Sequence, residues 1–283
     1  MLMKKIFAGA LTLMAVLAVS CTVSEPDPAG TPTGNNARLV SLSYYGFNLM
    51  HVSYDSQGRV TEIRVGDTED YDLYRFSYDP FEVMCEEWSY NSRFDENTGE
   101  YVEGVELRER DRWHDVKLST SGYITAMHVT SVDYTVAGMP EGDASTSHVL
   151  CHYDDEGHLT RINADSDVTV CHWDPQGRLT SVEYTESDAD HNGSYKATWE
   201  YSSFPNTHLQ WDPMLPLVGP VQITGIFGKA PSYFVKSVVT QYTNQQSTEE
   251  MQFSYRLNSN GFVSQSLYGD EYDAIQYTWK YEL

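Results

Sequence analysis

The sequence predicts an all-β protein, an antiparallel meander of hairpins that forms a large curled sheet or partial barrel with at most one or two short helices. In many short segments, apolar and polar residues alternate with a period of two, which is typical of strands with one buried face. Glycine-containing turns separate these segments at the spacing of hairpins, and long helical periodicity is absent. We expect roughly 12–16 strands in a single domain over residues 38–283.

The alternation is clearest around the first turn. Met50, Val52 and Tyr54 share one face of the segment before this turn, and Ile63 and Val65 share a face after it. The same pattern identifies five further strands: Leu39–Tyr45, Tyr71–Tyr78, Tyr195–Tyr201, Met251–Tyr255 and Ile275–Tyr281.

One segment does not alternate. Pro213, Pro216 and Pro220 interrupt any regular element between Asp212 and Lys229. A short helix or an irregular cap is therefore expected there.

Five turns share one design, in which a strand ends, a glycine reverses the chain and an alternating strand returns. Their glycines are Gly58, Gly122, Gly157, Gly177 and Gly261. The best copy, residues 173–180, reads Trp-Asp-Pro-Gln-Gly-Arg-Leu-Thr, and the copy at residues 153–160 precedes it by 20 residues. Asp and Pro favour the opening of a turn, and glycine tolerates the positive φ that closes it.

The first twenty residues have the features of a lipoprotein signal peptide. Lys4 and Lys5 form a positive start, and the apolar stretch Ile6–Val19 is shorter than the roughly 20 residues that span a bilayer. The end of this segment, Ala-Val-Ser followed by Cys21, resembles the lipobox at which bacterial lipoproteins are cut and lipidated. The alternative is ordinary signal-peptidase cleavage, with Cys21 incidental.

Residues 21–37 are expected to be a flexible tether. Ser24–Asn36 contains three prolines, two glycines and no large apolar side chain, so it cannot pack and would reach roughly 30–40 Å when extended. Glu25 and Asp27 resemble a diluted form of the acidic surface-export signal of some Gram-negative gut bacteria. We therefore predict an outer-membrane lipoprotein displayed on the cell surface, with the periplasmic face of that membrane as the alternative.

Two resemblances follow from these motifs. The pattern Tyr-Asp-x-x-Gly-Arg-Leu/Val-Thr resembles the YD repeat, also called the Rhs repeat, whose hairpins stack into curling sheets. The chain is also similar to a lipoprotein family of unknown function from Gram-negative gut anaerobes, which combines a lipobox, YD-like hairpins and a Tyr-rich C-terminus. Residues 225–229, Gly-Ile-Phe-Gly-Lys, with Ser237-Val238-Val239, are similar to a segment of that family. The resemblance covers roughly residues 38–283 and implies the fold and an envelope location, but no reaction.

The charge excludes two classes of partner. The chain has 18 Lys and Arg against 41 Asp and Glu, a net charge of −23, and removal of the first twenty residues leaves 16 cations against 41 acids, or −25. This field repels nucleic acids and disfavours adsorption to anionic lipid through a basic patch. The expected contact with the membrane is therefore the lipid on Cys21.

One segment has the spacing of calcium ligands. Asp188, Asp190 and Asn192 place oxygen atoms at alternate positions before a glycine, with Glu186 nearby. An EF-hand is excluded because Trp199 occupies the position of its bidentate Glu. The alternative is a polar hairpin loop, and no cofactor other than calcium is suggested.

The cysteines are expected to be structural. Cys151-His152 and Cys171-His172 repeat at a period of 20, but neighbours in a strand point to opposite faces, which disfavours a zinc site. An intervening strand separates Cys151 from Cys171 by roughly 9–10 Å, too far for a disulfide. A bridge from Cys85 to one of them stays open.

The 21 tyrosines and six tryptophans allow two interpretations. They can fill the packed face of the sheet through cross-strand pairs. Alternatively, Trp88 and Tyr90, or Trp211, can form a platform that stacks on sugar rings.

The leading functional hypothesis is a non-catalytic binding module whose ligand is a glycan or an envelope or host protein. A structural or scaffolding subunit of an envelope complex is the second hypothesis. An all-β hydrolase is the third, and it would need two convergent carboxylates roughly 5–9.5 Å apart. No motif of a known catalytic site occurs in the sequence.

Overall fold

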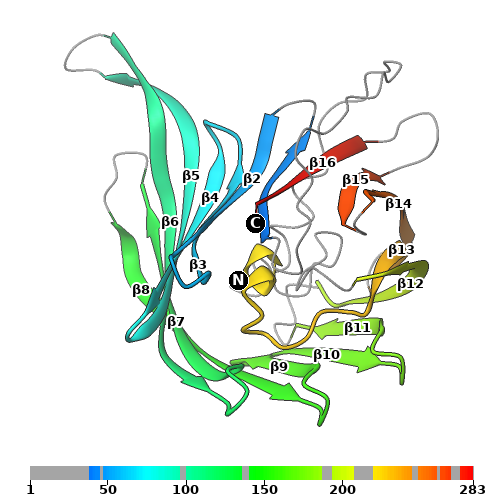
Figure 1. Cartoon of the computed structure of the whole chain (residues 1–283). Coiled ribbons are helices and arrows are strands. Elements are labelled where there is room, and N and C mark those ends of the chain that lie inside the picture. Colours follow the sequence, from blue (N-terminus) through cyan, green and yellow to red (C-terminus); the bar gives the residue numbers. More distant parts are fainter. Residues whose placement is uncertain are drawn as a thin grey trace.

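The computed structural model describes residues 38–44, 47–95, 100–135, 140–186, 193–206, 219–243, 248–259, 262–268 and 275–282. This part of the chain contains sixteen strands and one short 3-10 helix (Figure 1). The first eight strands are β1 (Arg38–Tyr44), β2 (Phe47–Tyr54), β3 (Val60–Gly66), β4 (Tyr71–Tyr78), β5 (Phe81–Asp95), β6 (Glu100–Leu118), β7 (Ile124–Tyr134) and β8 (Pro140–Tyr153). They are followed by β9 (Leu159–Ala164), β10 (Asp167–Trp173), β11 (Leu179–Thr185), β12 (Tyr195–Pro205), the 3-10 helix η2 (Gly219–Thr224), β13 (Tyr233–Tyr242), β14 (Thr248–Leu257), β15 (Val263–Tyr268) and β16 (Ile275–Glu282).

The sheet closes into a barrel. Each strand pairs antiparallel with its neighbours in the sequence, and β16 pairs back with β1, where Trp279 lies opposite Leu42 (Figure 1). The predicted antiparallel meander is therefore confirmed, but the sheet is more than the predicted curled sheet or partial barrel. Alternation reports only on neighbouring residues, so it carries no information on a pairing between the two ends of the chain.

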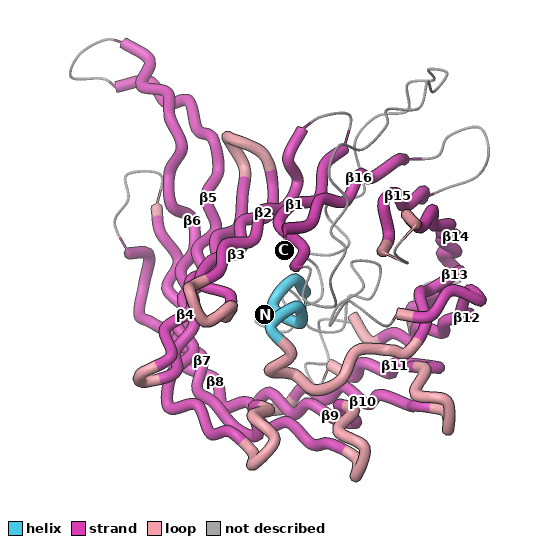
Figure 2. Tube along the Cα trace, in the orientation of Figure 1, coloured by secondary structure: helices cyan, strands magenta, loops and turns pink. Residues whose placement is uncertain are grey.

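The segment 219–232, which we call the inner segment, lies inside the barrel (Figure 2). Its helix η2 confirms the short helix expected between Asp212 and Lys229. The Phe227 ring packs edge-on against Trp113 of β6 at 5.9 Å, and the Ile124 N–H donates to the Ile226 carbonyl at 2.8 Å. Trp113 therefore faces inward, and its neighbours in β6 face outward.

The inner wall is mostly apolar. One contiguous core combines buried side chains from strands around the whole barrel with the inner segment, whose Val221 and Phe227 are almost fully buried. Large aromatic members include Trp113, Trp199 and Trp279. An enclosed interior explains how one sheet hides so many aromatic residues, since every strand contributes its inward face to the same core.

The turns of the repeat use one set of hydrogen bonds. After β10, Asp174 Oδ1 accepts the N–H groups of Gln176 and Arg178 at 2.9 and 3.0 Å, and its Oδ2 accepts Arg178 Nε at 2.6 Å. The Gly177 N–H donates back to the Asp174 carbonyl at 3.0 Å, and the φ of Gly177 is +70°. The turns at residues 55–59 and 154–158 have the same pattern. Positive φ is found at the predicted turn glycines Gly58, Gly122, Gly157 and Gly177.

The aromatic residue before each of these aspartates ties its repeat to an earlier strand. Tyr153 Oη donates to the Ile124 carbonyl at 2.7 Å, and Trp173 Nε1 donates to the Leu159 carbonyl at 2.8 Å. Ile124 and Leu159 are the first residues of β7 and β9. Tyr153 and Trp173 thus fix the starts of two strands, β7 and β9, each of which follows a preceding turn.

Among the described residues, no helix has the length and apolar character that crossing a bilayer requires.

Candidate functional site

The outward face of the barrel is charged. In β5, Glu86 lies between two arginines of the neighbouring strands, with Arg75 Nη1 at 2.9 Å from Oε2 and Arg110 Nη2 at 2.8 Å from Oε1. Further pairs join outward positions of adjacent strands: Arg112–Glu82, Lys196–Glu183 and Lys236–Glu200. Ion pairs thus cover the outside of the barrel, whereas the inside is mostly apolar, with a few carboxylates such as Asp111 and Glu109 on the inward face of β6.

The structure describes two of the three residues of the predicted aromatic platform. Trp88 and Tyr90 alternate with inward residues and share the outward face of β5. The Trp88 ring stacks on Tyr71 at 6.1 Å and 13°, and Arg64 lies 3.8 Å from the centre of the Tyr71 ring. Trp88 is half-buried in this stack and Tyr90 is 40 % exposed. The third predicted member, Trp211, lies outside the described residues.

A larger group of aromatic side chains gathers at the end of the barrel opposite the YD turns. We define the tyrosine belt as the inward-facing tyrosines at this end: Tyr44, Tyr184, Tyr195, Tyr242, Tyr268 and Tyr277. Neighbouring rings are in contact across strands, with centroids at 5.5 Å for Tyr184–Tyr195, 6.0 Å for Tyr195–Tyr242 and 6.1 Å for Tyr44–Tyr277.

The belt is partly covered and lies close to acidic groups. Burial, and then the charge of Glu249, raise the pKa of both Tyr242 and Tyr268. Tyr184 Oη donates to Asp167 Oδ2 at 3.0 Å. Aromatic faces next to carboxylates suit a ligand that offers both a C–H surface and hydroxyl groups. The sequence placed these tyrosines in strands, but gave no signal that strands far apart in the chain bring them to one end.

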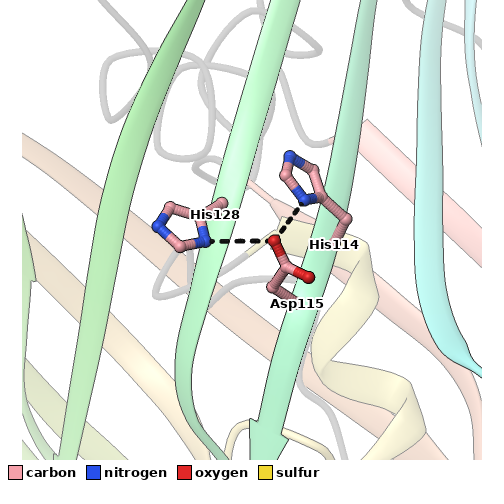
Figure 3. A group of neighbouring side chains, drawn as sticks. All are labelled: His114, Asp115 and His128. Atoms are coloured by element: carbon pink, nitrogen blue, oxygen red, sulfur yellow. Dashed lines mark hydrogen bonds and ion pairs between the residues drawn. The ribbon is translucent and has the colours of Figure 1, made fainter.

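A second cluster lies on the outward face where β6, β7 and β8 pair. His114 lies opposite His128 and His128 lies opposite His148, with ring centroids 5.7 and 5.0 Å apart. The register of β6 shifts directly after His114, and Asp115 in this bulge has a φ of +52°. Its Oδ2 lies 2.9 Å from His114 Nδ1 and 3.5 Å from His128 Nδ1 (Figure 3).

These three side chains, His114, Asp115 and His128, are the group of described residues whose ligand atoms lie close enough together to hold a metal ion. The sequence interpretation missed them. The only sequence signal is that each histidine falls on the polar face of an alternating strand, and the bulge that brings Asp115 between them has no recognisable pattern.

The thiols are structural, as predicted. Cys151 and Cys171 are both 4 % exposed on the inward face, on β8 and β10 with β9 between them. Burial raises the pKa of Cys151 to about 12, so this thiol is not a nucleophile at neutral pH. Cys85 is also a free thiol. The neighbouring His152 and His172 are exposed on the outer face, which agrees with the argument against a Cys-His zinc site.

Several predicted sites fall outside the described residues. These are the lipid attachment site Cys21, the calcium ligands Asp188, Asp190 and Asn192, and the turn glycine Gly261.

Comparison with known proteins supports the repeat and the fold. The family model for the RHS repeat matches residues 153–189, which include two of the three Asp-Gly turns described above. A porin-like protein from Bacteroides uniformis is similar in structure at a TM-score of 0.51 and 13 % identity, with 89 % of this chain and 99 % of that chain covered. A porin-like protein from Bacteroides vulgatus matches at a TM-score of 0.40 and 11 % identity, covering 86 % and 98 % of the two chains. No curated protein matches. The match over residues 153–189 confirms the resemblance to the RHS repeat that the Tyr-Asp-x-x-Gly pattern predicted.

Proposed function

We propose that this protein is an outer-membrane lipoprotein whose barrel stands beside the bilayer on a tether and binds a glycan without catalysing a reaction. The observation that carries the proposal is the polarity of the wall, which has ion pairs between strands on the outside and a contiguous apolar core on the inside. A barrel that spans an outer membrane has the opposite arrangement, an apolar outer band about 25 Å tall around a polar interior.

The strand lengths support the same conclusion. Membrane-spanning strands need roughly 9–11 residues, whereas β9 and β15 have six each and β10 and β11 have seven. A 16-stranded porin also leaves an aqueous channel, whereas the inner segment and a continuous apolar core lie inside this barrel. Attachment to the membrane therefore has to come from outside the barrel, and the lipobox at Cys21 supplies it.

The anchoring is tested by fractionating cells that express the full chain or the Cys21→Ala variant. We expect the natural chain to sediment with the outer membrane and the variant to be released into the aqueous fraction without detergent. Retention of Cys21→Ala in the membrane after an alkaline carbonate wash would show that the barrel itself is inserted.

The glycan assignment is based on the tyrosine belt. Tyrosine rings that touch at tilted angles and lie next to Glu249 and Asp167 offer the apolar faces and hydrogen-bond acceptors that sugars need. Tyr242→Ala and Tyr268→Ala should each weaken binding in an immobilised-glycan screen by at least about tenfold, which corresponds to about 1.4 kcal/mol. Tyr101→Ala is the matched control, because Tyr101 is 71 % exposed on the β5–β6 hairpin, away from the belt. Equal losses in all three variants would reject the belt as the site.

One observation favours a scaffolding role as the second candidate. Beyond Trp88, β5 pairs only with β6, and before Glu109, β6 pairs only with β5, so this hairpin has two open edges that extend past the barrel (Figure 1). Open strand edges accept a further strand from a partner. Shortening the hairpin by removing residues 91–103 should then abolish crosslinking to an envelope protein while leaving glycan binding unchanged.

A further inference from the structure

We propose that His114, Asp115 and His128 form a binding site for a divalent transition-metal ion, with zinc as the reference ion, on the outer wall of the barrel. This site is separate from the tyrosine belt and from the lipid anchor.

The distances fit one ion. Zinc binds imidazole nitrogen at about 2.0–2.1 Å and carboxylate oxygen at about 2.0–2.2 Å, so two ligand atoms of a tetrahedral site lie roughly 3.3 Å apart. Asp115 Oδ2 lies 2.9 Å from His114 Nδ1 and 3.5 Å from His128 Nδ1, on either side of that value. All three ligand atoms lie within 4.8 Å of one another (Figure 3). Movements of a few tenths of an ångström at two of the contacts, and a somewhat larger closure between the histidines, would bring them onto one ion.

Neighbouring side chains fix the orientation of the His114 and His128 rings. His114 Nε2 is 3.0 Å from Thr130 Oγ1, which is itself 3.0 Å from Thr146 Oγ1 on the next strand. A hydrogen bond at the far nitrogen fixes the orientation of a ligating imidazole, and in metal sites it is the usual second contact of such a ring. His128 packs between His114 and His148, so its ring plane is fixed from both sides.

One candidate ligand atom has only a long contact to its neighbour. His128 Nδ1 is inaccessible to solvent and makes no hydrogen bond within the part of the chain that the structure describes, and Asp115 Oδ2 lies 3.5 Å away from it (Figure 3). A buried imidazole nitrogen without a hydrogen bond is unfavourable, and an ion shared with Asp115 would remove that cost.

The position is accessible to ions. The Asp115 side chain is 71 % exposed and the His128 side chain is 43 % exposed, so an ion can approach from the side of the Asp115 carboxylate, and a local shift of the His128 ring would open its buried Nδ1 without a rearrangement of the barrel. Three protein ligands leave one tetrahedral position for water or for a donor atom from a partner. Imidazole and carboxylate ligands suit zinc, copper and nickel, whereas calcium and magnesium prefer oxygen ligands alone.

The test titrates the purified full chain with Zn²⁺ in calorimetry, with excess Mg²⁺ present to saturate the many exposed carboxylates. We expect one saturable site. His128→Phe keeps the stacked ring but removes both nitrogens, and Asp115→Asn suits the left-handed backbone but removes the charge. Loss of a contact that only supports a ligand weakens metal binding roughly 10–100-fold in known sites. Both variants remove a ligand itself, so each should weaken Zn²⁺ binding by at least that factor.

The matched control is His172→Phe, because His172 is a half-exposed histidine on the same outer wall with a single carboxylate, Glu183, at 4.0 Å. Its Zn²⁺ affinity should equal that of the natural chain.

Titration with Co²⁺ provides a second measurement, since a four-coordinate ion gives a much stronger visible absorption than a six-coordinate one. Absence of a saturable Zn²⁺ site in the natural chain, or an equal loss in His172→Phe, would overturn the assignment. Unchanged melting curves of the metal-free variants would exclude unfolding as the cause of any loss.

Discussion

At the scale of single residues, the aspartate of the YD turn accepts the hydrogen bonds that hold the turn together. One carboxylate holds two backbone N–H groups and the side chain four residues later, so the turn is fixed by contacts within five residues. The pattern predicts Arg at that later position, and His158 replaces it in one copy. Its Nδ1 contacts Asp154 Oδ2 at 3.0 Å and its ring stacks on Trp173 at 4.5 Å, so the histidine takes the place of the arginine.

The charge of this aspartate gives a prediction that depends on pH. Burial raises the pKa of Asp174, but hydrogen bonds from Arg178 and Gln176 outweigh that effect and leave the pKa below the ordinary value of 3.8. A carboxyl whose folded pKa is lowered stabilises the fold above its unfolded pKa, and this contribution is lost as pH falls through the folded pKa.

Asp174→Asn keeps the Oδ1 acceptor and removes the charge. Its free energy of unfolding at pH 7 should be lower than that of the natural chain by about 1 kcal/mol, because one charge-assisted contact to a half-exposed arginine is lost. The difference between the two proteins should shrink below about pH 4 in urea titrations. A difference that stays constant from pH 7 to pH 3 would contradict this account.

At the scale of elements, the inner segment is attached to the turns. The Lys229 N–H donates to the Gly157 carbonyl at 2.9 Å, and the Ser232 N–H donates to the Gly177 carbonyl at 3.0 Å. The sequence predicted the hairpins because their signals are local, and it predicted a short helix from the prolines. It did not predict that this segment enters the barrel, because that depends on contacts with strands that are distant in the sequence, among them β3, β6 and β7.

Two glycine substitutions distinguish the steric contact between the inner segment and the turn at Gly157 from the cost of a positive φ alone. Gly228 has a φ of +91°, and a Cβ there would lie 2.6 Å from the Gly157 carbonyl oxygen. Gly122 has a φ of +81° with open space around its Cβ position. Gly122→Ala should cost about 1–2 kcal/mol in unfolding free energy through φ alone, and Gly228→Ala about 1–3 kcal/mol more. If thermal or urea unfolding gave the same loss of unfolding free energy for both variants, the inner segment would not be packed tightly against the turn at Gly157.

At the scale of the whole molecule, the pairing of β1 with β16 that closes the barrel could not be predicted from the sequence. The two strands lie at opposite ends of the described chain, and their facing residues, such as Leu42 and Trp279, carry no mark that distinguishes them from other strand residues. The same limit explains the sites. Trp88 and Tyr90 were found because they are close in sequence, whereas the tyrosine belt and the histidine cluster are assembled by pairing between distant strands.

Closure predicts the effect of removing the last strand. A chain that ends at residue 270 would leave β1 and β15 with unpaired edges and would expose the inward faces that β16 covers. We expect this truncated chain to form oligomers or aggregates in light scattering, and to lose its cooperative melting transition. A monomeric truncated chain with an unchanged melting curve would contradict the role of closure.

The tie between each aromatic residue and an earlier strand has a consequence for how such barrels arise. The hairpins that begin with β8 and β10 each carry a turn-forming aspartate and glycine, and each is joined to an earlier strand by one side chain and one carbonyl group. A duplicated stretch of about 20 residues would therefore bring with it all the contacts needed to join the growing wall. Lineages could in this way widen or narrow the barrel by gain or loss of hairpins, provided that the two end strands still meet.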